Sequence, residues 1–467
     1  MNTETIAAIS TAMNNSGIGI IRISGEEAFD IIGKIFRPAN PDKKLSEVKS
    51  HTVHYGTIMD GETIVDEVLV LTMRAPHTYT REDTVEIDSH GGMFVMQRIM
   101  ELVLKAGARP AEPGEFTKRA FVNGRIDLSQ AEAVIDIINA ENDYALKSTV
   151  TQLKGSVSEK IRLQRSALLE QIAYIEAALD DPEHIEMEGY GQVLLPKLQE
   201  IEDCVEELIR SADDGRIIKE GIRTVILGKP NVGKSSLLNA LVGSERAIVT
   251  QIPGTTRDAL EESIRLKDVT LNIIDTAGIR STEDIIEKIG VDKAREYAAD
   301  ADLIVWVVDS SSDLDENDLE VAQLIAGRKA VILLNKQDLP EVTGKEKLFE
   351  QLGNGQATAL GKIPVIGISA LKESGLDVFS ETVCQMFYNK DINFNDQVYI
   401  TNIRQKKALT EAKESLSRAV ASIEDGMPED FFTIDMMDAY SALGRVIGES
   451  VEDDLADEIF AKFCMGK

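Results

Sequence analysis

The chain has 467 residues, which is too many for one hydrophobic core and indicates about three domains. It has no apolar run long enough to span a bilayer and no basic-then-apolar signal at its start, so we expect no membrane span. The net charge of −30, from 80 acidic and 50 basic side chains, excludes nucleic-acid binding through a broad basic face. Any RNA contact needs a local basic patch or a partner's surface. The three cysteines Cys204, Cys384 and Cys464 lie far apart, which favours a reducing cytosol and excludes an all-cysteine zinc site.

Residues 1–118 are predicted to form an α+β domain. Apolar, β-rich runs predict a strand ending in a turn at 18–25 and a strand running into a small turn at 80–92. The run at 65–73 is apolar and alternates poorly, which predicts a buried strand, and helical spacing follows at 93–104. Glu86 stands between Val85 and Ile87, so its side chain points to the opposite face of the strand. If the strand lies at a sheet edge, that side chain faces solvent. If the face lines a pocket, the side chain is a hydrogen-bond acceptor there. We expect His90 to be a packed turn residue rather than a catalyst.

Two predominantly helical segments, 119–215 and 380–467, flank a region of different pattern. Residues 125–181 contain no proline and one glycine, and a second helical stretch at 193–211 is expected to lead into the next strand. Later helices are predicted at 404–423, 434–447 and 451–463. Residues 216–379 alternate strands and helices, which indicates a doubly wound α/β domain with a mostly parallel sheet. The fold class is therefore multidomain α+β and α/β, with a Ras-like P-loop domain inserted into a helical bundle.

The strongest motif is G-K-P-N-V-G-K-S at 228–235, between a β-rich run and a good helix former. A strand that enters a glycine-rich turn at a helix N-terminus binds phosphate through backbone N–H groups and the helix dipole. Lys234 is predicted to reach the β- and γ-phosphates, and the Ser235 hydroxyl to hold Mg²⁺.

Further motifs specify guanine and complete the site. Asn335-Lys336-Gln337-Asp338 follows a strand, and the Asp338 carboxylate can accept hydrogen bonds from guanine N1–H and the exocyclic amine, which adenine does not offer in that position. The predicted nucleotide-binding residues are Asn231, Val232, Gly233, Lys234, Ser235, Ser236, Thr250, Gln251, Ile252, Pro253, Gly254, Thr255, Thr256, Asp275, Thr276, Ala277, Gly278, Asn335, Lys336, Asp338, Ser369 and Ala370. Thr255 and Thr256 fit the switch threonine of the Mg²⁺ shell, and Asp275 fits a contact to Mg²⁺ through water.

Hydrolysis requires an oriented water, but Ile279 stands where many GTPases carry glutamine. An apolar side chain cannot orient water. The domain is therefore either a slow switch, or an acid downstream supplies this function; the candidates are Glu283, Asp284 and Glu287. These acids are equally compatible with a solvated helix start. Arg257 and Arg280 lie on loops, but no pattern identifies either as an arginine finger.

The chain resembles the MnmE/TrmE family of tRNA-modification GTPases from end to end. The resemblance is carried by E-P-G-E-F-T-K-R-A-F-V-N-G-R-I-D-L at 112–128, G-T-T-R-D at 254–258, D-T-A-G-I at 275–279 and F-C-M-G-K at 463–467. It implies a homodimer joined through the N-terminal domains, and a heterotetramer with the FAD-containing MnmG partner. Together these proteins are implied to add an aminomethyl or carboxymethylaminomethyl group to C5 of the wobble uridine of certain tRNAs. Met465 replaces the isoleucine or leucine usual in the family, which is one apolar residue for another.

The resemblance also implies two small-ligand sites. Tetrahydrofolate, in a 5-formyl or 5,10-methylene form, is implied to contact Arg22, Glu86, Arg125 and Lys467. K⁺ is implied to take the part of the arginine finger, held by Asn231, Thr250, Ile252 and Thr255, and Glu287 to orient water. Cys464 matches the family's C-terminal cysteine.

Two other readings stay open. A ribosome-bound GTPase would share the nucleotide motifs but would need a basic RNA-binding domain, and none is visible. A folate-binding scaffold in which GTP only sets the shape would retain the N-terminal and C-terminal motifs.

Overall fold

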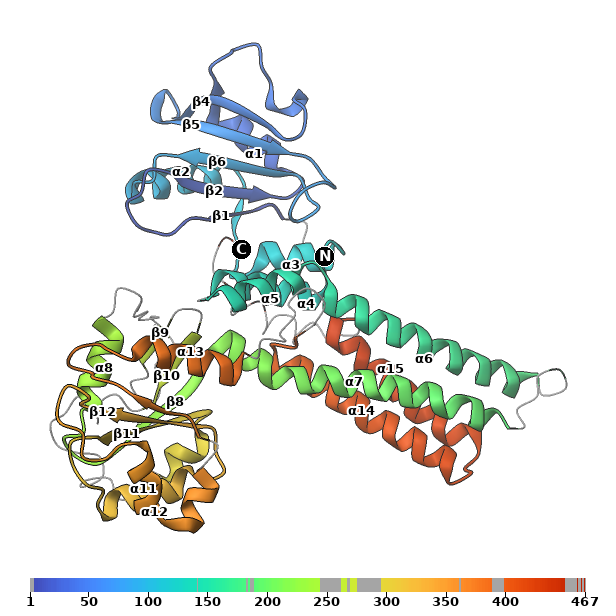
Figure 1. Ribbon diagram of the computed structural model, residues 1–467. Coiled ribbons are helices and arrows are strands. Elements are labelled where there is room, and N and C mark those ends of the chain that lie inside the picture. The colour runs from blue at the N-terminus through green and yellow to red at the C-terminus, as the bar shows by residue number, and fades with distance from the viewer. Residues whose placement is uncertain are drawn as a thin grey trace. The chain divides into compact units, whose positions relative to one another are not determined.

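The structure is a computed structural model (Figure 1), and it describes residues 4–140, 142–181, 184, 189–243, 262–266, 269–274, 295–360, 363–388, 399–449, 460, 463 and 466. The chain forms two compact units. The first comprises 1–138, 150–205 and 407–467, and the second comprises 139–149 and 206–406. In the described residues, no helix combines the length and apolar character that crossing a bilayer requires.

The N-terminal part of the first unit is a sheet of order β3-β4-β5-β6-β2-β1-β7. Its strands are β1 (Ile6–Ile9), β2 (Gly19–Ser24), β3 (Phe36–Pro38), β4 (Thr52–Asp60), β5 (Thr63–Met73), β6 (Thr84–Ser89) and β7 (Arg109–Pro110). Neighbouring strands are antiparallel, except that β1 and β7 are parallel. Helices α1 (Ala28–Ile35) and α2 (Met93–Lys105) cover one face and build a core with it.

The other face of this sheet carries exposed apolar side chains. We expected β5 to be buried on both sides, because its sequence alternates poorly. That expectation was wrong: Val68 and Val70 are buried, whereas Leu69 between them is 44% exposed. Leu69 lies opposite Tyr55 of β4, which is 55% exposed. The helices of this domain cover one face only, so the alternate side chains remain open.

The remainder of the first unit is helical. The helices of the two flanking segments are α3 (Glu115–Val122), α4 (Leu128–Ile138), α5 (Asp143–Leu153), α6 (Ser156–Asp180), α7 (Tyr190–Glu220), α14 (Ile403–Glu424) and α15 (Glu429–Ile447). Helix α6, from the first segment, packs along α15, from the second. The two segments therefore share one bundle, as predicted, although parts of α5, α7 and α14 belong to the second unit. Of the helix predicted at 451–463, only residues 460 and 463 lie within the described chain.

Helix α7 is longer than the predicted 193–211 and continues through Gly215 to Glu220. A side chain at Gly215 would collide with the backbone carbonyl of Ile400. The glycine is therefore a point of close packing within the helix rather than its end.

The second unit contains a sheet of order β13-β12-β11-β8-β10-β9. Its elements are β8 (Ile222–Leu227), α8 (Lys234–Gly243), β9 (Glu262–Leu266), β10 (Val269–Ile273), β11 (Leu303–Asp309), α11 (Glu316–Ile325), β12 (Ala330–Asn335), α12 (Lys345–Leu360), β13 (Val365–Gly367) and α13 (Leu376–Phe387). All described pairs are parallel except β9 with β10. Two apolar clusters pack against the sheet. This is the predicted α/β architecture, in which ligands bind beyond the carboxyl ends of the strands.

Candidate functional site

The phosphate loop connects the end of β8 to the start of α8. Its backbone adopts left-handed conformations at Asn231 (φ 61°) and Gly233 (φ 99°). A methyl group at Gly233 would collide with the side-chain nitrogen of Asn335. Because the first N–H groups of α8 have no carbonyl partner within the helix, the loop ends at a position that favours an anion.

The polar side chains of this loop occupy two different environments. Lys234 is buried, and its Nζ donates hydrogen bonds to the carbonyl oxygens of Gly228 at 2.8 Å and Lys229 at 2.9 Å. Ser235 and Ser236, in the first turn of α8, are exposed. A hydroxyl in that position is accessible to a metal ion beside the phosphates.

Asn335 joins three loops of the candidate site. Its side chain is 2% exposed, and its Nδ2 donates to the Val232 carbonyl oxygen at 2.8 Å. Its Oδ1 accepts from the backbone N–H of Ala370 at 3.0 Å. One buried amide thus ties the phosphate loop to the 335–338 loop and to the 369–370 loop, as a site that holds both ends of a nucleotide requires.

Asp338 and Lys336 have defined partners. The Ser369 hydroxyl donates to Asp338 Oδ1 at 2.5 Å and holds the pKa of this carboxyl below its ordinary value. Lys336 Nζ lies 2.6 Å from Asp309 Oδ2 at the end of β11. Burial acts to raise the pKa of Asp309, but the hydrogen bonds from Lys336 and Ser311 outweigh it and lower the pKa. Both carboxylates are therefore charged at neutral pH.

Several predicted residues lie outside the described chain. These are Thr250, Gln251, Ile252, Pro253, Gly254, Thr255, Thr256, Asp275, Thr276, Ala277, Gly278, Glu287, Cys464 and Lys467, together with the alternatives Arg257, Arg280, Glu283 and Asp284. The switch, potassium and water-orienting assignments therefore remain predictions.

A second cluster of charged groups lies on the N-terminal sheet. Arg22 on β2 is directly opposite Glu86 on β6, and Arg22 Nε donates to Glu86 Oε1 at 2.7 Å. The two side chains are 18% and 16% exposed. Because β6 lies between β5 and β2, Glu86 is not at a sheet edge. Its side chain is therefore a hydrogen-bond acceptor in a largely buried environment and does not face open solvent.

Aromatic rings and a second arginine surround this pair. The Arg22 guanidinium lies 5.7 Å from the ring centre of Tyr79 and 5.6 Å from that of Phe116. Arg125 lies 4.6 Å from the same Tyr79 ring and donates to the Tyr79 carbonyl oxygen at 3.2 Å. Tyr79 therefore places two cations on one ring, and three of the four predicted folate residues belong to one cluster.

The C-terminal segment reaches the same cluster. The carbonyl oxygen of Gly466 accepts hydrogen bonds from Arg22 Nη1 and from Ser10 Oγ, both at 3.3 Å. Gly466 has a φ of 87°, and a side chain there would meet the Ile9 carbonyl oxygen at 2.7 Å. The residue before the predicted ligand Lys467 thus lies beside Arg22.

Sequence reasoning missed four members of this cluster: Ser10, Tyr79, Asp88 and Phe116. Phe116 lies in the family motif at 112–128, which was the available signal, whereas Ser10 and Tyr79 carry none. Asp88 follows Glu86 by two positions on β6, and burial and then the Glu86 charge raise its pKa. His90 was also misjudged: its side chain is 73% exposed rather than packed, and its Nδ1 lies 2.7 Å from Asp66 Oδ1.

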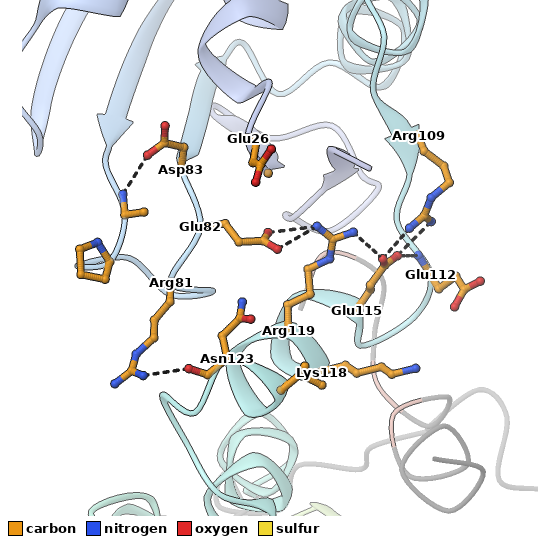
Figure 2. A pocket seen from close by; sticks show the side chains of 14 residues that line it. Glu26, Arg81, Glu82, Asp83, Arg109, Glu112, Glu115, Lys118, Arg119 and Asn123 are labelled. Carbon is orange, nitrogen blue, oxygen red and sulfur yellow. Dashed lines mark hydrogen bonds and ion pairs between the residues drawn. The ribbon is translucent and has the colours of Figure 1, made fainter. Parts of the chain in front are cut away.

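A pocket of about 820 Å³ in the first unit shares no lining residue with either predicted site (Figure 2). A chain of ion pairs crosses it, in which Arg109 and Arg119 bind Glu115, and Arg119 also binds Glu82. Burial alone would raise the pKa of Glu115, but the hydrogen bonds from Arg109, from the Glu112 backbone and from Arg119 lower it. These charges satisfy one another, so the network connects α3 to the sheet and leaves no strong signal for a ligand.

Comparisons with known proteins agree with the sequence motifs. Residues 5–125 match the family model described as GTP-binding protein TrmE N-terminus, and residues 128–464 match that of the MnmE helical domain. The chain is 55% identical to the tRNA modification GTPase MnmE of Lachnoclostridium phytofermentans over 467 residues, which is 100% of both chains. It is 44% identical to the protein of the same name from Bacillus subtilis, covering 99% of this chain and 100% of the relative. Among solved structures, 35% of it resembles 97% of the G domain of the T. maritima FeoB iron transporter, at 30% identity and a TM-score of 0.25.

Proposed function

The chain belongs to the MnmE/TrmE family of tRNA modification GTPases, and from this premise we propose that it hydrolyses GTP to drive modification of tRNA at C5 of the wobble uridine. The modification is an aminomethyl or carboxymethylaminomethyl group, whose one-carbon unit comes from tetrahydrofolate. The protein acts as a homodimer, in a heterotetramer with the FAD-containing MnmG partner. The four segments 1–118, 119–215, 216–379 and 380–467 are the proposed folate-binding, helical, GTPase and second helical parts.

The observation that carries the GTP assignment is the pair of hydrogen bonds by which the Asn335 side chain holds the phosphate loop and the 369–370 loop. Phosphate binding and base recognition belong to separate loops, and one buried amide holds both. In this proposal Asp338 accepts from guanine, Lys234 leaves its two loop carbonyls for the phosphates, and Ser235 and Thr256 hold Mg²⁺, which neutralises developing phosphate charge.

The hydrolytic step is proposed to depend on a distant acid and a monovalent cation. Glu287 orients the attacking water in place of the missing glutamine. Asn231, Thr250, Ile252 and Thr255 hold K⁺, which supplies positive charge beside the phosphates as G domains pair across the dimer. Asn231 is exposed and left-handed, which leaves its side chain available on the surface of the loop.

Exchange of potassium for sodium tests this step. We expect Glu287→Ala to retain GTP affinity and lose potassium-stimulated turnover, because the residue acts on water and not on the nucleotide. Equal turnover in sodium and potassium, or stimulated turnover in Glu287→Ala, would refute the proposed mechanism. GTP binding by the wild type and by Glu287→Ala, measured in the same buffers, separates loss of catalysis from loss of binding.

The folate assignment is supported by the chemistry of the N-terminal cluster. Glu86 Oε1 is bound to Arg22, while Oε2 has no hydrogen-bond partner among the described residues. This oxygen can accept from the amino and ring N–H groups of a pterin. Arg125, and Lys467 next to Gly466, suit the carboxylates of the folate tail.

The dimer assignment is supported by the open face of the N-terminal sheet. Val53, Tyr55 and Leu69 are 56%, 55% and 44% exposed there. Contiguous exposed apolar side chains on a sheet commonly mark an interface. Sedimentation of a Leu69→Asp variant is expected to give monomers, whereas an unchanged dimer would place the interface elsewhere.

Mass spectrometry of wobble nucleosides tests the function as a whole. Cells that lack this chain are expected to lose the modified uridine and accumulate its unmodified form. Wild-type chain restores the product, and Lys234→Ala does not, because phosphate binding drives the cycle. An unchanged nucleoside profile in the deletion strain would overturn the proposal.

A further inference from the structure

The second residue of the phosphate loop is anchored outside the predicted nucleotide site. Lys229 Nζ lies 2.9 Å from Asp318 Oδ2 and 3.2 Å from Asp315 Oδ2. It also donates to the carbonyl oxygen of Asp313 at 3.3 Å. These three residues belong to the start of α11 and the loop before it, none of which carries a nucleotide motif.

The anchor is built into the fold. Asp315 caps α11 and Asp318 completes a capping box, in which Asp318 Oδ2 accepts from the Asp315 backbone at 3.1 Å. Asp318 is fully buried, and the Lys229 side chain is 12% exposed. Burial acts to lower the pKa of Lys229, but the hydrogen bonds and charges of Asp318 and Asp315 raise it, so the lysine stays charged.

Stability alone does not explain this arrangement. Asp318 Oδ1 is buried and has no hydrogen-bond partner among the described residues. A buried ion pair with an unsatisfied oxygen is commonly no more stabilising than an apolar pair of similar size. Such a pair does fix geometry, because the charges tolerate few alternative positions.

The backbone of Lys229 connects the anchor to the phosphate-binding lysine. The carbonyl oxygen of Lys229 accepts from Lys234 Nζ, and Pro230 follows directly and restricts the backbone. A shift of the Lys229 side chain therefore moves the part of the loop against which Lys234 is placed.

We propose that Asp318 is a positioning residue that acts through Lys229 to hold the phosphate loop in its nucleotide-binding conformation. The inference rests on the proposed GTP-binding function and adds a residue outside its motifs. The same 309–318 segment holds Lys336 of the base-recognition loop through Asp309. The 309–318 segment thus forms ion pairs with both the phosphate loop and the 335–338 loop.

The test compares nucleotide binding with fold stability in the full-length chain. Lys229→Met removes the charge, Lys229→Arg keeps it, and Lys229→Met with Asp318→Asn removes both charges but keeps an oxygen that can accept from the Asp315 backbone. Lys347→Met is the matched control, because Lys347 makes a 2.7 Å bridge to Asp313 of the same segment but lies on α12. Dissociation of a fluorescent GDP analogue, KM and kcat for GTP, and thermal unfolding are measured for each.

We expect Lys229→Met to release GDP about tenfold faster and to raise KM by a similar factor with little change in kcat, within the range of coupling between contacting residues. Lys229→Arg restores most of the affinity. The double variant unfolds at a higher temperature than Lys229→Met, because it leaves no unpaired buried charge, and yet binds nucleotide as weakly as Lys229→Met. Lys347→Met binds as the wild type does.

Three outcomes overturn the inference. In the first, Lys229→Met releases GDP at the wild-type rate. In the second, the nucleotide affinities of the variants rise and fall with their unfolding temperatures. In the third, Lys347→Met loses as much nucleotide affinity as Lys229→Met. If the wild-type chain itself fails to bind GTP or GDP, the proposed function fails instead, so the two failures are distinguishable.

Discussion

The two candidate sites of this chain are built in opposite ways. The nucleotide site is a set of short loops at strand ends, in which backbone groups and one buried amide set the geometry. The N-terminal cluster brings together the side chains of Ser10, Arg22, Tyr79, Glu86 and Arg125 and the backbone carbonyl of Gly466, which are distant in the sequence. A backbone site is sensitive to any added atom, whereas a side-chain cluster is sensitive to lost charge. The two sites should therefore fail under different substitutions.

The largest effect is expected from one methyl group in the phosphate loop. Gly233→Ala places a Cβ on a residue with φ of 99° and drives it into Asn335. The left-handed conformation alone costs about 1–2 kcal/mol, and with the collision we expect GDP affinity to fall about 100-fold. Titration with a fluorescent GDP analogue measures this loss.

Gly243→Ala is the matched control, because Gly243 lies at the end of α8, the helix that follows Gly233, and a Cβ there would meet nothing within 4 Å. If Gly233→Ala bound nucleotide as well as Gly243→Ala, backbone geometry would not set the site.

An intermediate effect is expected from removing one charge in the N-terminal cluster. Glu86→Gln leaves Arg22 without its carboxylate and removes the proposed pterin acceptor. We expect 5-formyltetrahydrofolate affinity to fall about tenfold, in line with about 1–3 kcal/mol for an unsatisfied partner, with GDP affinity unchanged. Equilibrium dialysis measures the first and fluorescence the second.

Glu101→Gln breaks an ion pair with Arg98 in the same domain, but both of those side chains are exposed. We expect the folate affinity of Glu101→Gln to equal that of the wild type. An equal loss in both variants would mean that general charge, not this cluster, governs folate binding.

The smallest effect is expected in the pH dependence of GDP affinity. The hydrogen bond from Ser369 depresses the pKa of Asp338, so the contribution of the charged carboxylate is lost only as pH falls through that lowered value. In Ser369→Ala the pKa returns toward its ordinary value, and the decline in GDP affinity should begin at a higher pH. Ser374→Ala, on the same loop, is the control. Superimposable affinity–pH curves for Ser369→Ala and wild type would contradict the role of this hydrogen bond.

The same contrast explains what the sequence could predict. The 228–235 loop and Asn335 were predictable, because contiguous motifs encode a strand, a turn and a helix start. The cluster around Arg22 was accessible only through family resemblance, and Tyr79 could not have been named, since its role depends on loop packing. The prediction that α7 ends before Gly215 was wrong for a similar reason, because the packing of Ile400 against that glycine is not visible in the local sequence.

The Lys229–Asp318 pair shows the same limit within the nucleotide domain. Lys229 occupies a position that the pattern G-x-x-x-x-G-K-[ST] leaves unspecified, and its partner Asp318 lies on a helix with no nucleotide motif. Motifs identify the groups that touch a ligand, whereas the groups that hold them in place are found only in three dimensions.

The buried amide of Asn335 has a consequence for engineering. Because Asn335 bonds to the phosphate loop, whereas the Asp338 carboxylate bonds to Ser369 of the 369–370 loop, a change at position 338 is expected to alter the nucleobase preference and leave phosphate binding intact. A purine with a carbonyl in place of the exocyclic amine of guanine requires a donor at position 338, and Asp338→Asn supplies one. An orthogonal nucleotide could then switch this GTPase alone among all those in a cell.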